Sequence, residues 1–168
     1  TKHKAVLLYD TEQSEVQLFK NVTNLIKRAK QVVKPDEFKA FCLTGMSRKE
    51  RLHAIVQSMD RYYYQYDGIQ LVVIDGIADL VRCEAESVAI IDELYRLAGI
   101  YKTCIICVLH FVPNGLKLRG HLGSELQRKA AAILSIEKDE DPAMSVVKAL
   151  KVRDGSPLDV PLMLFSWD

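Results

Sequence analysis

The sequence has no apolar run long enough to cross a bilayer and no signal peptide, so we expect a cytoplasmic protein with no membrane partner. Its four cysteines are too few for a disulfide framework, which favours free thiols in a reducing compartment. The formal net charge is only +1, so any contact with nucleic acid must come from a local patch. Repeats and Pro/Gly/Ser-rich linkers are also missing, and we expect one domain over residues 1–168.

Short apolar runs alternate with helical patterns in the first two-thirds of the chain, and this alternation predicts parallel βαβ units. The predicted strands are residues 5–9, 38–43, 70–74 and 103–109, and the predicted helices are residues 15–33, 47–65 and 84–101. Closely spaced strands at 131–137, 145–152 and 160–165 predict an antiparallel extension. The fold class is therefore α/β, with a mostly parallel sheet that is covered on both faces.

The helix predicted at residues 15–33 carries apolar side chains at helical spacing, and we expect this stripe to face the core. The stripe consists of Val16, Phe19, Val22, Leu25, Ile26 and Ala29. In the next helix, Ser47 and Glu50 have the spacing of a capping box, which predicts where that helix begins.

Polar side chains follow three of the predicted strands, at the edge where open α/β sheets bind ligands. Glu12 follows the first strand and is placed to polarise an attacking water; the alternative is an exposed residue in the first turn of the following helix, where the helix dipole favours a carboxylate. Asp75 can hold hydrated Mg²⁺ beside a phosphate, or can serve as a helix N-cap or a turn residue. His110 can bond a terminal phosphate, or only local backbone groups.

Two groups of cations lie in the last third of the chain. Lys151 and Arg153 alternate along one strand, so both point to the same face and can reach a phosphate on an adjacent subunit; the alternative is a charged, solvated edge strand. The stretch 116–129 is basic and contains two glycines, which suits contact with a nucleic-acid backbone; a solvated helix face over 124–129 is the alternative. The DNA-binding candidates are Lys117, Arg119, Arg128 and Lys129.

The order of these features resembles the RecA-like ATPases, and within them the DnaB-type and plasmid RepA-type replicative helicases. Residues 7–12 (LLYDTE) resemble the strand with the catalytic glutamate, and 71–76 (LVVIDG) resemble the Walker B strand. Residues 108–110, with Asn114, resemble the γ-phosphate sensor strand, and 150–155 (LKVRDG) resemble the KxR finger motif. The resemblance implies a RecA-like three-layer sandwich and a ring of subunits that hydrolyses ATP at its interfaces while it moves along DNA.

In this family, residues at the positions of Glu12 and Asp75 activate water and organise Mg²⁺ through a water molecule, His110 reads the γ-phosphate, and Lys151 and Arg153 act across the ring interface. The resemblance therefore implies ATP and Mg²⁺ as cofactors, with Glu12, Asp75, His110, Lys151 and Arg153 as the catalytic set. It also implies single-stranded DNA as partner and a homo-oligomeric ring.

The sequence departs from that family in one large respect, because no GxxxxGK[ST] phosphate-binding loop occurs in it. We expect this chain to be part of a larger parent protein in which the loop and the first strand precede residue 1. We expect this chain alone to bind no ATP tightly and to be inactive. Two alternatives remain. One is a hydrolysis-deficient RecA-fold subunit for DNA binding or assembly, and the other is a recombinase-type RecA-like ATPase.

Overall fold

The computed structural model describes residues 3–110 and 120–166. By their internal contacts, these residues divide into two compact units, 1–125 and 126–168, which are described separately below. Within the described residues, no helix is long and apolar enough to cross a membrane.

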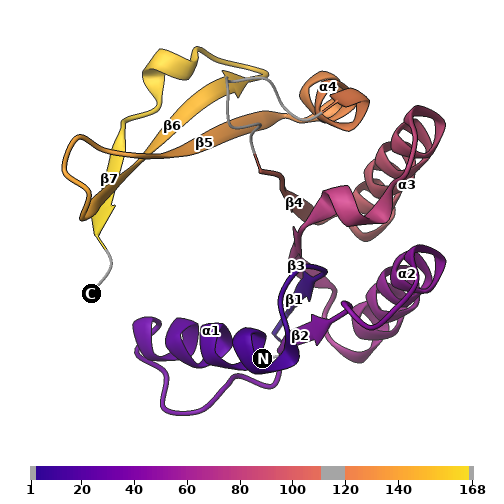
Figure 1. The fold of residues 1–168 in the computed structure, drawn as a ribbon. Coiled ribbons are helices and arrows are strands. Elements are labelled where there is room, and N and C mark those ends of the chain that lie inside the picture. The colour runs from indigo at the N-terminus through magenta and orange to yellow at the C-terminus, as the bar shows by residue number, and fades with distance from the viewer. Residues whose placement is uncertain (1–2, 111–119, 167–168) are drawn as a thin grey trace. The chain divides into compact units, whose positions relative to one another are not determined.

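A four-stranded parallel sheet forms the centre of the first unit (Figure 1). Its order is β2 (Phe38–Cys42), β1 (Ala5–Asp10), β3 (Ile69–Asp75) and β4 (Cys104–Val108). The helices α2 (Arg48–Gln65) and α3 (Glu84–Tyr101) lie on one side of this sheet, and α1 (Glu15–Arg28) lies on the other. A short 3₁₀ helix, η1 (Ile77–Leu80), follows β3. The first unit is thus a three-layer α/β sandwich, and the α/β prediction is confirmed.

The core lies between the sheet and the pair α2 and α3. Leu7 is paired in register with Val72, and Tyr9 with Ile74, so these four side chains share one face, and all are fully buried. The opposite face is less completely covered, since Ile106 of β4 remains 46% exposed. Coverage on both faces, which the apolar strands predicted, is therefore complete only beneath α2 and α3.

Helix α1 differs from its prediction. It buries Leu18, whereas Val16 and Phe19 of the expected core stripe are exposed. The helix also ends earlier, at Arg28, because Lys30 adopts a left-handed conformation (φ 54°) and the amide of Gln31 bonds back to the carbonyl of Ile26 at 3.1 Å. That bond across the helix end is typical of a Schellman motif, which terminates a helix.

Helix α2 begins where the capping box predicted. The Ser47 side chain accepts a bond from the amide of Glu50, and the Glu50 carboxylate accepts one from the amide of Ser47 at 2.7 Å. Both bonds satisfy amides that the first turn of a helix leaves without partners.

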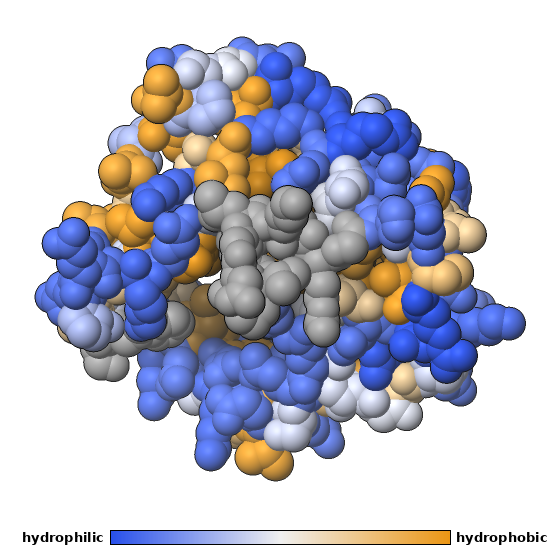
Figure 2. Space-filling view, turned by 45° about the horizontal axis from the view of Figure 1, so that its top comes forward, coloured by the Kyte–Doolittle hydropathy of each residue, from blue (hydrophilic) through white to orange (hydrophobic). Residues whose placement is uncertain are grey.

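The second unit contains a three-stranded antiparallel sheet in the order β5 (Ala132–Lys138), β6 (Met144–Val152) and β7 (Met163–Ser166). The predicted antiparallel extension is confirmed. The last strand begins three residues later than expected, because η2 (Pro157–Asp159) precedes it and Pro161 has no amide to pair in a sheet. Helix α4 (Gly120–Lys129) spans the boundary between the units. Figure 2 shows hydrophobic residues scattered among hydrophilic ones on one face of the molecule.

Candidate active site

Three of the predicted site residues meet at the carboxyl edge of the parallel sheet. Asp75 ends β3 and is paired in register with Asp10 on one side and Val108 on the other. His110 follows β4 by two residues, and its Nε2 lies 3.0 Å from Oε2 of Glu12, which follows β1. The topology therefore brings Glu12, Asp75 and His110 to one edge, as parallel strands require of residues that follow their carboxyl ends.

Thr11 joins the ends of β1 and β3. Its side chain is buried, and its hydroxyl lies 3.1 Å from the carbonyl oxygen of Asp75 and 2.8 Å from that of Gly76. Its amide also donates to the Asp75 carbonyl at 3.1 Å. These bonds hold the backbone that carries the Asp75 carboxylate against the backbone that carries Glu12.

Asp10 shapes the turn that presents Glu12. One carboxylate oxygen, Oδ1, accepts bonds from the amides of Glu12 at 2.9 Å and Gln13 at 2.8 Å. This is the geometry of an Asx turn, in which an aspartate bonds the backbone two and three residues ahead of it. Asp10 is itself buried, so its carboxylate is committed to this turn rather than presented to solvent.

Asp75 lies in an acidic environment. Partial burial raises the pKa of its carboxyl above the ordinary value, the charges of Asp10 and Glu12 raise it further, and His110 lowers it. The carboxylate does not cap η1, because the capping position belongs to Gly76, which makes no side-chain bond. The interpretation of Asp75 as a helix cap is therefore wrong, and the carboxylate is free of that role.

The acidic edge suits one hydrated cation. Among the described residues, no group of three His, Cys, Asp or Glu side chains is close enough to hold a metal ion directly. A Mg²⁺ ion that keeps most of its waters needs only one or two carboxylates together with substrate phosphates. Asp75 fits that requirement, since a nearby cation would offset the repulsion from Asp10 and Glu12.

The predicted finger residues belong to the second unit. Lys151 Nζ donates to the carbonyl of Gln127 at 2.5 Å, and Arg153 donates to the carbonyl of Lys129 at 2.7 Å. Both side chains thus bond the last turn of α4, a common arrangement for cations at a helix carboxyl end. They reach the same helix end, in keeping with the prediction that both point to one face. The alternative of a solvated edge strand is not contradicted, because β6 pairs with β7 only over residues 144–147 and its end at Lys151 pairs with β5 alone.

The four DNA-binding candidates divide between two regions. Lys117 and Arg119, together with Asn114, lie outside the described residues. Arg128 and Lys129 lie in the last turn of α4, so this part of the basic stretch is helical, as its alternative interpretation predicted.

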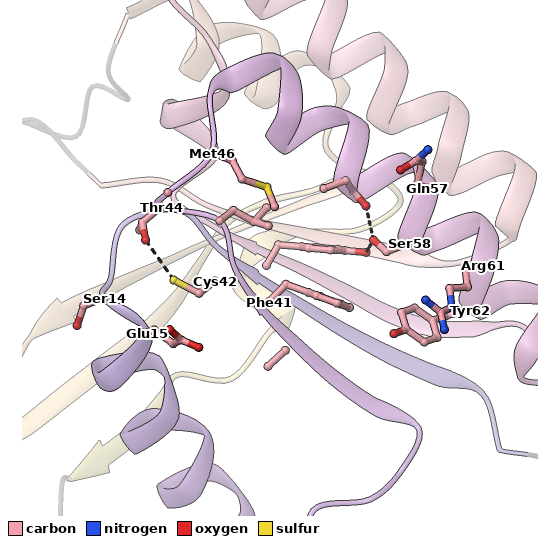
Figure 3. A pocket seen from close by; sticks show the side chains of 15 residues that line it. Ser14, Glu15, Phe41, Cys42, Thr44, Met46, Gln57, Ser58, Arg61 and Tyr62 are labelled. Carbon is pink, nitrogen blue, oxygen red and sulfur yellow. Dashed lines mark hydrogen bonds between the residues drawn. The ribbon is translucent and has the colours of Figure 1, made fainter.

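A cleft of the first unit lies elsewhere, beside the outer strand β2 (Figure 3). Its volume is about 820 Å³, and Glu12, Asp75 and His110 do not line it. Tyr9 and Phe41 stack there with ring centroids 5.3 Å apart, and the Tyr9 hydroxyl bonds Ser58 at 2.7 Å. The cleft thus has an aromatic lining and is separate from the carboxylates at the sheet edge.

Comparison with known proteins decides the fold. No protein-family model matches the sequence, and no curated protein matches it. Among solved structures, the chain is similar to the RadB recombinase, with a TM-score of 0.62 and 20% sequence identity. The match covers 97% of this chain and 75% of the RadB chain. The fold is RecA-like.

The RecA-like fold explains why the polar residues meet at one sheet edge, but sequence reasoning missed two residues that build this edge. In the sequence, Asp10 and Thr11 are marked only as part of the LLYDTE run at residues 7–12. A buried aspartate that directly follows an apolar run and precedes a turn is the signal for the Asx turn. For Thr11 no such signal exists, because its partners, the carbonyls of Asp75 and Gly76, lie more than sixty residues away in the sequence.

Proposed function

We propose that this chain is part of a RecA-type ATPase that acts on DNA, with a helicase-type motor as the leading form. The observation that carries the proposal is the convergence of Glu12, Asp75 and His110 at the carboxyl edge of a RecA-like sheet, with Glu12 and His110 3.0 Å apart. A carboxylate that positions water, a second that holds hydrated Mg²⁺ and an imidazole that meets a phosphate are the parts that phosphoryl transfer needs.

Each residue has a distinct role in this proposal. Glu12 orients the attacking water and accepts its proton, and Asp75 holds Mg²⁺ through water. His110 bonds the terminal phosphate and, through its contact with Glu12, couples the presence of that phosphate to the position of the base. When bound, Mg²⁺ would neutralise charge on the transferred phosphoryl group. A phosphate-binding loop must come from another segment, since the printed sequence has none.

Lys151 and Arg153 act in trans in this proposal, on a nucleotide held by the neighbouring subunit. Their bonds to the end of α4 hold the two side chains side by side while leaving each with further donors, since an ammonium has three and a guanidinium five. These donors can meet a nucleotide on a neighbouring subunit only in an oligomer. The helicase-type motor needs that oligomer to be a ring.

A recombinase-type ATPase is the second candidate, and the likeness to the RadB recombinase favours it. The same carboxylates would hydrolyse ATP in both cases, but a recombinase would assemble on DNA as a filament. Electron microscopy of the protein on single-stranded DNA separates the two, since a closed ring supports the motor and an open helical array supports the recombinase.

Hydrolysis is tested on the longest natural chain that contains these 168 residues, with ATP, Mg²⁺ and single-stranded DNA. Glu12→Gln should lower kcat by at least about 10²-fold while ATP binding persists. Glu15→Gln, which removes a nearby exposed carboxylate from the first turn of α1, should leave kcat unchanged. Equal effects of the two substitutions would refute the role of Glu12. DNA binding or assembly by a wild-type chain that hydrolyses no nucleotide would favour the hydrolysis-deficient subunit.

The trans role of Arg153 is tested by mixing two inactive variants. Arg153→Ala alone should lower kcat by about 10³-fold, and Glu12→Gln alone should be inactive. In a mixed oligomer, random assembly places an intact Glu12 opposite an intact Arg153 at about a quarter of the interfaces. Activity that returns on mixing supports the proposal, whereas a mixture as inactive as its components would overturn the assignment in trans.

A further inference from the structure

Helix α1 and the turn after it carry a concentration of positive charge. Between residues 15 and 34 there are five cations and one acid, Glu15, which makes a local charge of +4 in a chain whose net charge is +1. The five cations are Lys20, Lys27, Arg28, Lys30 and Lys34. Within the described part of the chain, no ion pair holds the side chains of Lys20, Lys27 or Lys30, and all three are exposed.

Apolar side chains project into solvent from the same segment. Val16 is 67% exposed and Phe19 71%, and in the turn after the helix Val32 is 99% and Val33 77% exposed. The sequence pattern placed Val16 and Phe19 in the core, but α1 packs through Leu18 instead. Exposed valines and phenylalanine grouped in this way mark a contact surface rather than ordinary scatter.

The charged and apolar side chains share one face of α1. Residues three, four or seven apart are neighbours on a helix surface, so Val16 lies beside Phe19 and Lys20, and Lys20 lies in line with Lys27. At the end of this helix, Lys30 and Lys34 flank the exposed pair Val32 and Val33. Figure 1 shows α1 and the turn after it at the outside of the first unit, away from α2 and α3.

We propose that this basic and apolar surface, formed by α1 and residues 29–34, binds the surface of an anionic lipid membrane. Lysine ammonium groups attract lipid phosphate and carboxylate headgroups, while the apolar side chains enter the boundary between headgroups and acyl chains. The surface contacts the membrane without crossing it, which differs from the expectation of no membrane partner. That expectation rested on the lack of an apolar run long enough to span a bilayer.

Two observations favour a membrane over other acidic partners. The exposed valines gain little from stacking on nucleic-acid bases, which requires aromatic rings, and Phe19 is the one ring among the exposed apolar residues of this segment. Four of the five cations of this surface are also lysines, which protein–protein interfaces contain less often than the rest of a protein surface does. A lipid surface accepts projecting side chains and needs no matching pocket.

Sedimentation with lipid vesicles tests the proposal on the full chain. Binding should be strong to phosphatidylcholine vesicles that contain about 30% phosphatidylserine and absent from phosphatidylcholine alone. The double variant Lys20→Gln/Lys27→Gln should weaken binding about 25-fold, at about fivefold per lysine. Val32→Ser/Val33→Ser should weaken it at least about tenfold. The control Lys4→Gln/Lys102→Gln removes as much charge from two other exposed lysines and should bind normally.

Several results would overturn the proposal. These are equal binding to neutral and anionic vesicles, an equal loss in the control variant, or no vesicle binding at all. If the two lysine substitutions in α1 instead weaken binding to an oligothymidylate, or abolish self-association, the surface belongs to nucleic acid or to a second copy. Phe19→Trp gives an independent measurement, since its fluorescence should shift to shorter wavelength with anionic vesicles only. Vesicle binding requires neither ATP nor Glu12, so its failure leaves the proposed hydrolysis untouched.

Discussion

The Thr11 hydroxyl lies 2.8 Å from the carbonyl oxygen of Gly76, and this bond joins the turns that follow β1 and β3. Gly76 has a φ of 85°, and a Cβ at that position would clash with Thr11 Oγ1 and with Glu12 Cγ. The two turns that carry Glu12 and Asp75 are therefore in direct contact, and their spacing depends on one hydroxyl and one missing side chain.

Replacing Thr11 by valine should lower the free energy of unfolding by about 1–2 kcal/mol, because valine keeps the shape but leaves a buried carbonyl without its donor. Urea unfolding monitored by circular dichroism measures the change. Thr11→Ser keeps the hydroxyl and should retain most of the stability. Thr23→Val removes an exposed hydroxyl that bonds within α1 and should cost less than about 0.5 kcal/mol. A cost for Thr11→Val as small as that would contradict the importance of this bond.

Three glycine-to-alanine substitutions separate backbone strain from steric contact. Gly45→Ala should be nearly neutral, since nothing lies within 4 Å of the added Cβ and its φ is not positive. Gly68→Ala should cost about 1–2 kcal/mol for a left-handed alanine, because its φ is 97° but its nearest neighbour is 3.7 Å away. Gly76→Ala combines strain with a clash and should cost clearly more. Thermal unfolding of the three variants gives this order, and similar losses at Gly68 and Gly76 would contradict it.

Much of the fold follows from local patterns in the sequence. Apolar runs identify the strands, and Ser47 with Glu50 marks the beginning of α2 to the residue. The positions of Glu12, Asp75 and His110 after three strands are enough to predict a common edge, because parallel strands of one sheet end together.

The rest depends on contacts between distant residues. The periodicity of α1 identifies a helix but not the side that packs, which is why Phe19 was expected in the core and Leu18 was not. The bonds from Lys151 and Arg153 to the end of α4 also have no local signature, because a cation on a strand can meet a phosphate, a carbonyl or solvent. The sequence pattern within one element determines whether it is a helix or a strand. Which of its faces is exposed depends on the distant elements that pack against it.

Asp75→Asn should raise the free energy of unfolding at neutral pH. Burial and the neighbouring carboxylates raise the pKa of the folded-state carboxyl, so the folded chain binds its proton more tightly than the unfolded chain does. Stability attributable to this group therefore falls as pH rises from the ordinary pKa of 3.8 through the raised pKa, because the ionised form is the costly one in the folded chain. In urea unfolding, the variant should have a higher free energy of unfolding than the wild type at pH 7, and the difference should be smaller near pH 4. A destabilised variant at pH 7 would contradict this account.

Glu12→Gln and His110→Gln should leave the fold intact, so a change in hydrolysis can be assigned to the substituted group and not to unfolding. The pair they form is largely open to solvent, with the His110 side chain 75% and the Glu12 side chain 34% exposed, and such pairs contribute little to stability. Glutamine at position 12 also keeps the backbone amide that bonds Asp10. Each substitution should therefore change the free energy of unfolding by less than about 0.5 kcal/mol in urea titrations. A loss of several times that size would mean that the contact between β1 and β4 is structural, and any fall in hydrolysis would then report unfolding instead of a missing base.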